Sequence, residues 1–575
     1  MDPITLEVLG YRMGEVVHTM EHLLFHSGYS PILRESYDGS ATILDRNGYV
    51  VAGSGAPYHL FPYYYTAQYI IDRFKGEISP GDSFMANDPY HSGNSHVPDM
   101  AVVTPVFFDG EIIAYTACIA HKPDLGGLVP GSSSAGAREI FHEGVLFPGV
   151  RIWSNDGINR DVEAILRQNS RTPDEVAGDV RAQVGCTQVG AQRIVSLCQE
   201  YSAEEICQAF EEWIVISQRR LGDELEKIPD GVGVGTAYLD NDSVDLDRPV
   251  KIEVKVTKSG SRISLDFSGS NEIVTGPVNI RPQSTEAGAT LVLIGLLDPK
   301  IPINDGIRRA VEFINPPGRV THAVFPAPVN NYYPTMHLVY CSVLKAMDQL
   351  TGRVVAPAAL GIGGNTIGYV KARNGLPAVQ YELQNTSLGG TPSNDGAFGA
   401  MAMNQVTPST SLEILETEYP MRVTRFEPLV DSAGPGEFRG GVGYVREYEL
   451  LSAAKLSIRM GQFKFGGWGV NGGKGPKTTA KAVLNDGSDT EELLPPLQTR
   501  DLPSGTRFAI KMSGGGGYGN PYKRDPQRVL LDVTNGYVSV EAAVEDYGVA
   551  INRDSMTVDD EKTLELRSNK TKERG

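Results

Sequence analysis

Histidine is unevenly distributed along this sequence, and its placement indicates a metal site or an acid–base site. Most of the ten histidines lie early in the chain, at positions 18, 22, 26, 59, 91, 96, 121 and 142. Histidine titrates near neutral pH and is the commonest metal ligand in proteins. Two local motifs share the form His-x-Pro-Asp, at 96–99 and at 121–124. In each, the proline biases the preceding residue toward an extended backbone, which predicts two bent loops.

The two motifs border segments that are typical of neighbouring strands. The apolar stretch 100–108 follows the first motif, and the stretch 111–120 precedes the second. Two adjacent antiparallel strands would bring both motifs to the same end of a sheet. Imidazoles and carboxylates that converge there form a mixed nitrogen and oxygen set, which suits zinc, manganese or iron rather than calcium. The residues alone leave open the alternative of turn histidines with aspartates that cap loops.

A second histidine pattern lies in the first predicted helix, at residues 4–26. The run His18-Thr19-Met20-Glu21-His22 fits the H-x-x-E-H pattern of some zinc proteases, and His26 extends it by one helical turn. A helix would place the three imidazoles on one face. The alternative is a polar helix flank that packs against neighbouring loops.

Glycine-rich segments near the C-terminus superficially resemble nucleotide-binding loops. The segment 514–519 matches G-x-G-x-x-G, but Asn520 and Pro521 follow it where a helix would have to begin. The segment 472–474 resembles part of a P-loop, but Trp468 and Gly475 stand where the motif needs Gly and Ser or Thr. The first segment is therefore interpreted as a tight turn, and the chain is expected to have no ATP site of its own.

The composition excludes several classes of protein. The 575 residues include 52 Lys plus Arg and 70 Asp plus Glu, a net charge of −18, which disfavours nucleic acid as the main partner. The longest apolar stretches are far shorter than the ~20 residues of a membrane helix. Five cysteines without a CxxC pair argue against a disulfide framework or a thiolate metal knot. With no basic leader before an apolar run at the N-terminus, the expectation is a soluble cytoplasmic protein.

The order of patterns along the chain predicts a mixed α+β fold. Helical patterns appear at 4–26, 172–228 and 333–349, strand patterns at 40–130 and 234–270, and a glycine-punctuated, strand-like texture follows beyond 420. The expected organisation has five parts. They are a metal-site region at 1–170, a helical segment at 171–230, a mixed α/β core at 231–420, a β-rich region at 421–560 and a frayed tail at 561–575.

Several motifs in a consistent order resemble the hydantoinase B family. They are Asn87-Asp88-Pro89-Tyr90-His91, Ser95 to Asp99, Ala120-His121 with Asp124 to Gly127, Gly276 to Asn279, Asn304-Asp305-Gly306, Gly389 to Pro392, Arg439 to Gly443 and Ser513 to Pro521. The family includes the metal-holding subunits of ATP-dependent hydantoinases, caprolactamase and the acetone and acetophenone carboxylases, and part of 5-oxoprolinase. Two departures lie near the expected pocket. The segment 55–61 differs from the family's usual pattern, and Lys122 stands where many members have a histidine.

The resemblance implies roles for individual residues. The family's metal ligands fall on His96, Asp99 and His121, and Asp38 matches a fourth ligand of the hydrolase branch. Asp124 would lie in a second layer, where it orients an imidazole or handles a proton. Asp124 or His59 could serve as general base, and a buried structural histidine is the alternative for His59. The implied cofactor is one divalent transition metal, zinc in the first place, with manganese or iron as alternatives.

The resemblance also implies a division of labour between two subunits. A hydantoinase A-type partner, in an α2β2 hetero-oligomer, would bind ATP and Mg and phosphorylate the substrate's carbonyl oxygen. A metal-bound water in this chain would then attack the activated carbon of a hydantoin, lactam or oxoproline-like ring. The compact length favours this ATP-dependent cyclic amide hydrolase. The alternatives are a subunit of an ATP-dependent ketone carboxylase and a non-catalytic scaffold with a structural metal.

Overall fold

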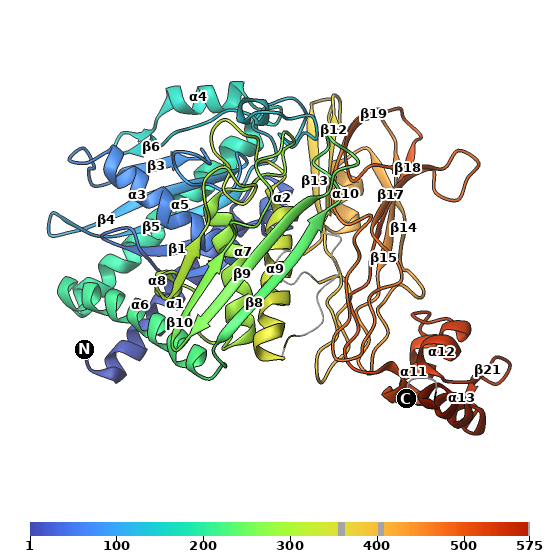
Figure 1. The fold of residues 1–575 in the computed structure, drawn as a ribbon. Helices are drawn as coiled ribbons and strands as arrows, with labels where there is room; N and C mark the ends of the chain where they lie inside the picture. The colour runs from blue at the N-terminus through green and yellow to red at the C-terminus, as the bar shows by residue number, and fades with distance from the viewer. Residues whose placement is uncertain (353, 355–362, 401–407, 573–575) are drawn as a thin grey trace.

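The two strands that border the histidine motifs lie at the centre of a seven-stranded antiparallel sheet. The computed structural model describes residues 1–352, 354, 363–400 and 408–572, and this sheet lies in the blue and cyan part of Figure 1. Its strand order is β2-β1-β5-β4-β3-β6-β7. The strands are β1 (Gly39–Asp45), β2 (Val50–Gly55), β3 (Ser83–Ala86), β4 (Asp99–Phe108), β5 (Glu111–His121), β6 (Val150–Ser154) and β7 (Gly157–Ile158).

Helices cover both faces of this sheet. Alternate residues of β4 and β5 belong to two different apolar cores. One core includes α1 (Pro3–His26), α5 (Pro173–Glu200) and α6 (Ala203–Glu226), and the other includes α3 (Leu60–Arg73). Every residue of β1 is buried as a result, without the alternation of a half-exposed strand. The helices predicted at 4–26 and 172–228 are thereby confirmed, the second as two helices. Shorter helices in this part are α2 (Pro31–Arg34), α4 (Arg160–Gln168) and the 3-10 helices Pro57–His59 and Ile140–Glu143.

A second sheet follows in the middle of the chain. Its order is β11-β10-β9-β8, with β8 (Gly231–Leu239), β9 (Val250–Ser259), β10 (Arg262–Asp266) and β11 (Val311–Ile314). Buried positions alternate along β9, as its alternating sequence predicts. The helices α7 (Pro282–Leu296) and α9 (Tyr332–Thr351) share a core with this sheet, and α8 (Asp305–Ala310) precedes β11.

Two further sheets pack face to face in the last third of the chain. One has the order β13-β12-β16-β19 and the other β14-β15-β20-β17-β18, and both contribute to one apolar core. This β sandwich lies beside the N-terminal half of the protein in Figure 1. Its elements are β12 (Gly363–Tyr369), β13 (Ala378–Gln384), α10 (Leu412–Glu418), β14 (Met421–Pro428), β15 (Tyr444–Leu450), β16 (Ala454–Met460), β17 (Lys481–Leu484), β18 (Glu492–Leu494), β19 (Leu497–Leu502) and β20 (Arg507–Met512).

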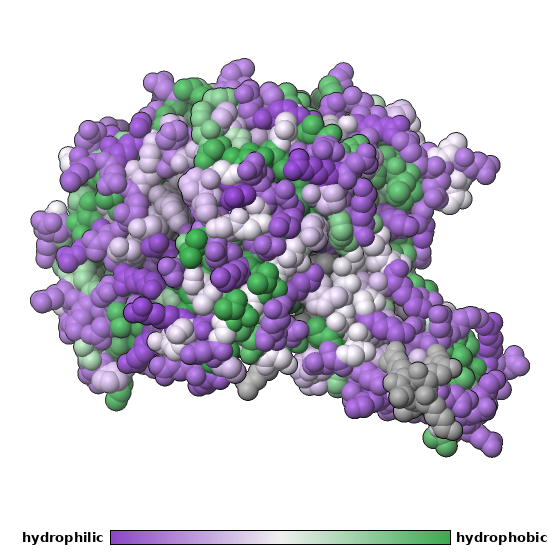
Figure 2. Space-filling view, in the orientation of Figure 1, coloured by the Kyte–Doolittle hydropathy of each residue, from purple (hydrophilic) through white to green (hydrophobic). Residues whose placement is uncertain are grey.

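The C-terminal segment differs from its prediction as strand and frayed tail. It forms a small helical lobe with its own core, which protrudes from the body of the molecule and has a mainly hydrophilic surface (Figures 1 and 2). Residues 561–572 of the expected tail lie in α13, which begins with two acidic residues that suit a helix N-terminus. Residues 573–575 lie outside the described ranges. The elements are the 3-10 helix Pro521–Lys523, α11 (Pro526–Thr534), α12 (Val540–Tyr547), β21 (Ile551–Asn552), β22 (Thr557–Val558) and α13 (Asp560–Lys572).

Two expectations from composition can be compared with the described residues. None of the helices in the described ranges is both long and apolar enough to span a lipid bilayer. All five cysteines are free thiols, and four of them are buried.

The glycine-rich segments pack their backbones directly against one another. Gly434 N donates to Gly515 O at 2.8 Å, and Gly515 N donates to Gly441 O at 2.9 Å. A Cβ on Gly440 would lie 1.9 Å from Gly515 O, and one on Gly517 would lie 2.1 Å from a backbone oxygen of Pro435. Glycine is needed here because the chains approach more closely than a side chain allows. The 514–519 motif is therefore part of this packing.

The glycine packing predicts a clear effect of one added methyl group. Gly440→Ala is expected to destabilise the protein by about 1–3 kcal/mol, because the new Cβ would overlap a backbone oxygen. Differential scanning calorimetry would detect this as a lower unfolding temperature. Gly466→Ala is the matched control, since the nearest atom would be 4.0 Å away. Equal unfolding temperatures for the two variants would contradict the close-packing explanation.

Candidate metal centre

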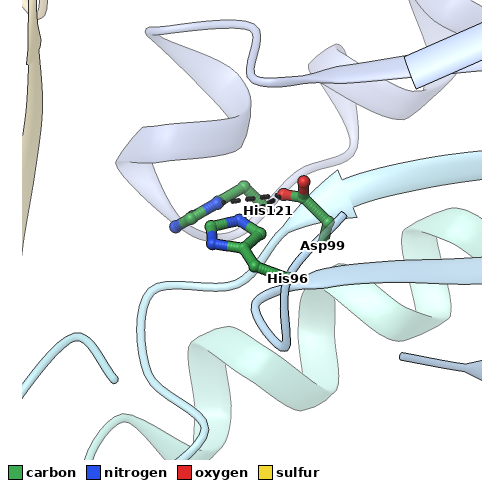
Figure 3. A group of neighbouring side chains, drawn as sticks. All are labelled: His96, Asp99 and His121. Carbon is green, nitrogen blue, oxygen red and sulfur yellow. Dashed lines mark hydrogen bonds and ion pairs between the residues drawn. The ribbon is translucent and has the colours of Figure 1, made fainter. Parts of the chain in front are cut away.

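The antiparallel pairing of β4 with β5 brings the two histidine motifs together. Asp99, the first residue of β4, lies directly opposite His121, the last residue of β5. Nε2 of His96 lies 2.9 Å from Asp99 Oδ1, and Nδ1 of His121 lies 3.1 Å from the same oxygen (Figure 3). One ligand atom from each residue lies within 4.8 Å of the others. All three residues are at most 3% exposed.

The hydrogen bonds of the two imidazoles leave nitrogens suited to a metal ion. Nδ1 of His96 lies 3.0 Å from the backbone oxygen of Asn330 and donates to it, so Nε2, which faces Asp99 Oδ1, is the nitrogen that would bind an ion. Nε2 of His121 is buried and has no hydrogen-bond partner. A buried polar atom without a partner is rare, and a bound ion is one explanation for it. Two nitrogens and one carboxylate oxygen fit zinc, manganese or iron.

Electrostatics hold Asp99 and His121 in the protonation states that metal binding needs. Burial alone would raise the pKa of Asp99, but the charges of His96 and His59 and the hydrogen bond with His121 outweigh it, so this pKa lies well below its usual value. Burial lowers the pKa of His121, even though Asp99 opposes the shift. At neutral pH the site therefore presents a carboxylate and a neutral imidazole, as a cation requires.

Asp38 and His59 lie at the edge of this group. Oδ2 of Asp38 is 3.9 Å from Nδ1 of His121, and Tyr58 donates a long hydrogen bond of 3.4 Å to its other oxygen. Asp38 is outside the tight group of three, so its role as fourth ligand stays a prediction. His59 ends a 3-10 helix, and its Nε2 lies 3.6 Å from Asp99 Oδ2. Both ring nitrogens of His59 are buried without hydrogen-bond partners.

Asp124 is held in a different set of contacts. Its Oδ1 accepts hydrogen bonds from Gly126 N and Arg171 N, and its Oδ2 accepts from Gly131 N and Arg171 Nη1, all between 2.8 and 3.0 Å. These bonds fasten the loop that contains Gly126 and Gly127. The geometry supports an anchoring role, and the predicted proton transfer by Asp124 remains untested.

Lys122, the departure in the second motif, extends to the opposite side of the strand from His121. Its Nζ donates to Gln183 Oε1 on α5 at 2.6 Å and to Ala120 O at 3.3 Å. Burial lowers its pKa to about 8. The substitution therefore changes the packing between β5 and α5 rather than the group of ligands.

The first-helix histidines lie elsewhere, on the solvent side of α1. His18 contacts Glu21 and Ser54, and the rings of His22 and His26 are 3.8 Å apart. Across the described ranges, ligand atoms cluster at His96, Asp99 and His121, and α1 holds no such cluster. The H-x-x-E-H pattern is thus a helix flank here.

A small cavity of about 40 Å³ adjoins the three ligands. Its walls come from the N-terminal sheet, the first turn of α9 and the β sandwich. Tyr58 lies in the segment 55–61 that was expected near the pocket. Sequence patterns did not identify the other residues that complete the cavity, which are Asn330, Asn331, Tyr332, Tyr333, Pro334, Gly363, Gly364, Tyr381, Leu383 and Arg459. The clustered polar and aromatic residues at 330–333 were the strongest available signal.

Glu143 positions one of these wall residues. Its Oε1 accepts hydrogen bonds from Val329 N and Asn330 N, both at 2.8 Å. Burial raises the pKa of Glu143 well above its usual value, although these two bonds oppose the shift. Glu143 thereby fixes the loop whose Asn330 carbonyl accepts from His96. Its link to the ligand group is therefore indirect.

The fold and the site define a mixed α+β protein with a buried His–Asp–His site between an α/β half and a β sandwich. Residues 2–521 match the family model described as Hydantoinase B/oxoprolinase, and the chain belongs to this family.

The similarity to relatives extends over nearly the whole chain. A protein of Pseudomonas sp. (strain NS671) that is assigned as the B-type subunit of a D-/L-hydantoinase is 31% identical, across 99% of this chain and 98% of its own length. The acetophenone carboxylase delta subunit of Aromatoleum aromaticum (strain DSM 19018 / LMG 30748 / EbN1) is 27% identical, across 92% of this chain and 84% of its own. The crystal structure of ATP-dependent caprolactamase from Pseudomonas jessenii has a TM-score of 0.90 and 28% identity, and covers 99% of this chain and 100% of that one.

The geometry of the site predicts that the chain binds one divalent metal ion through these three ligands. The purified chain is expected to contain about one equivalent of zinc, manganese or iron by inductively coupled plasma mass spectrometry. His96→Ala should lose it, because the variant removes one of three ligands. The control is His22→Ala, on the exposed α1 pattern, which should keep the metal. Loss of metal in His22→Ala alone would place the ion on α1.

Proposed function

We propose that this protein is the metal-binding subunit of an ATP-dependent cyclic amide hydrolase that acts on a hydantoin, lactam or oxoproline-like ring. The observation that carries the proposal is the buried group of His96, Asp99 and His121, whose ligand atoms lie within 4.8 Å of one another. Relatedness along the whole chain to a hydantoinase-type subunit and to caprolactamase supports the reaction class. The coarser statement, a hydantoinase B-type subunit of such complexes, follows from family membership.

The chain's own residues account for binding, orientation and proton transfer. His96 and His121 would offer their Nε2 nitrogens, and Asp99 an ionised oxygen, to a zinc, manganese or iron ion. A divalent ion there would act as a Lewis acid and lower the pKa of a coordinated water toward neutrality. His59, beside Asp99 and with no hydrogen-bond partner on either ring nitrogen, would accept the proton of that water. Burial of the group keeps bulk solvent from the reacting carbonyl.

ATP would be handled by a partner of the hydantoinase A type, in an α2β2 assembly. This chain's glycine-rich segments serve backbone packing, which agrees with an ATP and Mg site on another subunit. The partner would phosphorylate the carbonyl oxygen and so make the carbonyl carbon a better electrophile. The protein would then act in the cytoplasm, where ATP is available.

A ketone carboxylase is the second candidate, because the acetophenone carboxylase delta subunit is 27% identical. In that reaction the same three residues would hold the ion that binds an enolate or carbon dioxide. The nucleotide-free acetone carboxylase structure has a TM-score of 0.90 at 20% identity, which shows a shared fold. A non-catalytic scaffold with a structural metal is the third candidate.

The reaction test uses the chain together with its ATP-binding partner, and compares ring opening with fixation of labelled bicarbonate. ATP-dependent ring opening without incorporation of label is the expected result. Asp99→Ala should fold, bind the partner and lose turnover, because Asp99 contacts both imidazoles. Incorporated label would replace the hydrolase with the carboxylase. Full turnover by a folded, metal-free Asp99→Ala complex would support the scaffold.

The two candidate bases predict different phenotypes. His59→Gln is expected to lower kcat about 100-fold or more, with metal content and unfolding temperature retained, as for loss of a general base. Asp124→Asn is expected to destabilise by about 1–3 kcal/mol, because Asn cannot accept all the hydrogen bonds of the loop. Kinetics, metal analysis and calorimetry on both variants check this. A stable Asp124→Asn variant without turnover would instead assign the base to Asp124.

A further inference from the structure

Arg459, on β16, carries a buried positive charge in the wall of the metal cavity. Its Nη1 donates to Ser133 Oγ at 2.9 Å, its Nη2 donates to Thr366 Oγ1 at 3.3 Å, and its Nε has no partner. Its guanidinium lies 4.5 Å from the centre of the Tyr381 ring. All these neighbours are neutral, and within the described ranges no carboxylate lies within ion-pair distance of Arg459.

The other buried arginines of the described chain are neutralised. Each lies in an ion pair of 2.6 to 2.9 Å, namely Arg439 with Asp532, Arg446 with Glu382 and Arg524 with Asp395. The internal residues outside the described ranges, at 353, 355–362 and 401–407, include no Asp or Glu in the sequence. A buried charge without a counter-ion is costly. The charge on Arg459 is therefore available to an anion that enters the cavity.

Other groups around the cavity also favour an anion. Asn331, 2% exposed, has no hydrogen-bond partner for either its amide nitrogen or its amide oxygen. Asn331 precedes α9, a helix of 20 residues whose first turn lines the cavity. A helix N-terminus carries partial positive charge and free N–H groups. Asp38 and Asp99 are the carboxylates of the cavity wall, and a divalent ion together with Arg459 would leave the site net positive.

A hydrogen-bonded chain links Arg459 to the ligand group. Ser133, which accepts from Arg459, donates to Asn330 Oδ1 at 2.7 Å, and the backbone oxygen of Asn330 accepts from His96. Gly364 faces Arg459 across the β12–β16 pair, and a Cβ there would lie 3.1 Å from Nη2. Because Gly364 has no side chain, there is room beside it for the guanidinium of Arg459.

We propose that Arg459 and Asn331, with the N-terminus of α9, form an oxyanion subsite that holds the phosphoryl group of the activated substrate next to the metal ligands. This inference rests on the proposed function and names the group by which the substrate is recognised. A guanidinium pairs with phosphate through two parallel hydrogen bonds, which fixes orientation as well as affinity. A substrate carboxylate has the same bidentate chemistry and is the other source of an oxyanion.

The test titrates inorganic phosphate, and separately acetate, into the full-length zinc-loaded chain by isothermal titration calorimetry. Arg459→Gln is expected to weaken phosphate binding about tenfold or more, as for loss of a charge-assisted hydrogen bond. Arg459→Lys should bind with intermediate affinity. The control is Arg500→Gln, on the neighbouring strand β19, whose side chain is 39% exposed and paired with Glu492. The control should bind phosphate like the parent chain.

Several results separate the outcomes. Arg459-dependent binding of phosphate in preference to acetate supports the phosphoryl group, and the reverse preference assigns the subsite to a carboxylate. Equal phosphate affinity in the parent chain and in folded Arg459→Gln overturns the subsite. If Arg459→Gln does not fold, Gly364→Ala provides the test, because the added Cβ would lie 3.1 Å from Nη2 and shift the guanidinium by a few tenths of an ångström, which should weaken binding. The metal content of each sample is measured, and the phosphate titration is repeated on the metal-free chain. These two controls distinguish loss of the metal site from loss of the oxyanion subsite.

Discussion

The candidate site depends on the main-chain pairing of Asp99 with His121 across β4 and β5. A slip of one residue in this pairing would turn one of the two side chains to the opposite face of the sheet. Both faces of the sheet are covered by apolar cores, so such a slip would also bury the wrong side chains of the whole strand. The packing of the sheet therefore determines the geometry of the ligands, and the short loop that contains His96 only has to fold back onto the start of β4.

Burial of the Asp99 carboxylate costs free energy of desolvation, and the contacts that offset this cost also set the protonation of the site. A carboxylate removed from water is stable only with compensating partners, and Asp99 finds them in the surrounding imidazoles, which keep its pKa low. Asn330 supplies the opposite kind of support, because its carbonyl fixes the proton on His96. Glu143 in turn holds the backbone of Asn330. Residues from three separate parts of the sequence thus set the protonation of one ligand.

Local sequence patterns were sufficient for the strands at 100–108 and 111–120, the helices at 4–26 and 172–228, and the convergence of His96, Asp99 and His121. They missed α3 (Leu60–Arg73), which lies within the stretch 40–130 that was expected to form strands. Asp38 entered only through resemblance to a family. Arg459 could not be found in this way, because it occupies an ordinary position in a strand and meets the site through a contact with Ser133, far away in the sequence. The helical C-terminal lobe was missed although Ser539 and Gly548 cap α12 as helix signals predict. The glycine-punctuated segments before this lobe indicate strands, and the strand prediction extends to residue 560 on that basis.

The position of Arg459 late in the chain has a consequence for biosynthesis. All three metal ligands are present once residue 121 has been synthesised, and their strands are adjacent in the sequence, so they can pair early. The wall that includes Arg459 and Tyr381 requires β12, β13 and β16, which leave the ribosome much later. During synthesis the ligands are therefore open to solvent, and an ion can enter before the β sandwich docks. An ion that bound the nascent chain would be enclosed when the β sandwich docks.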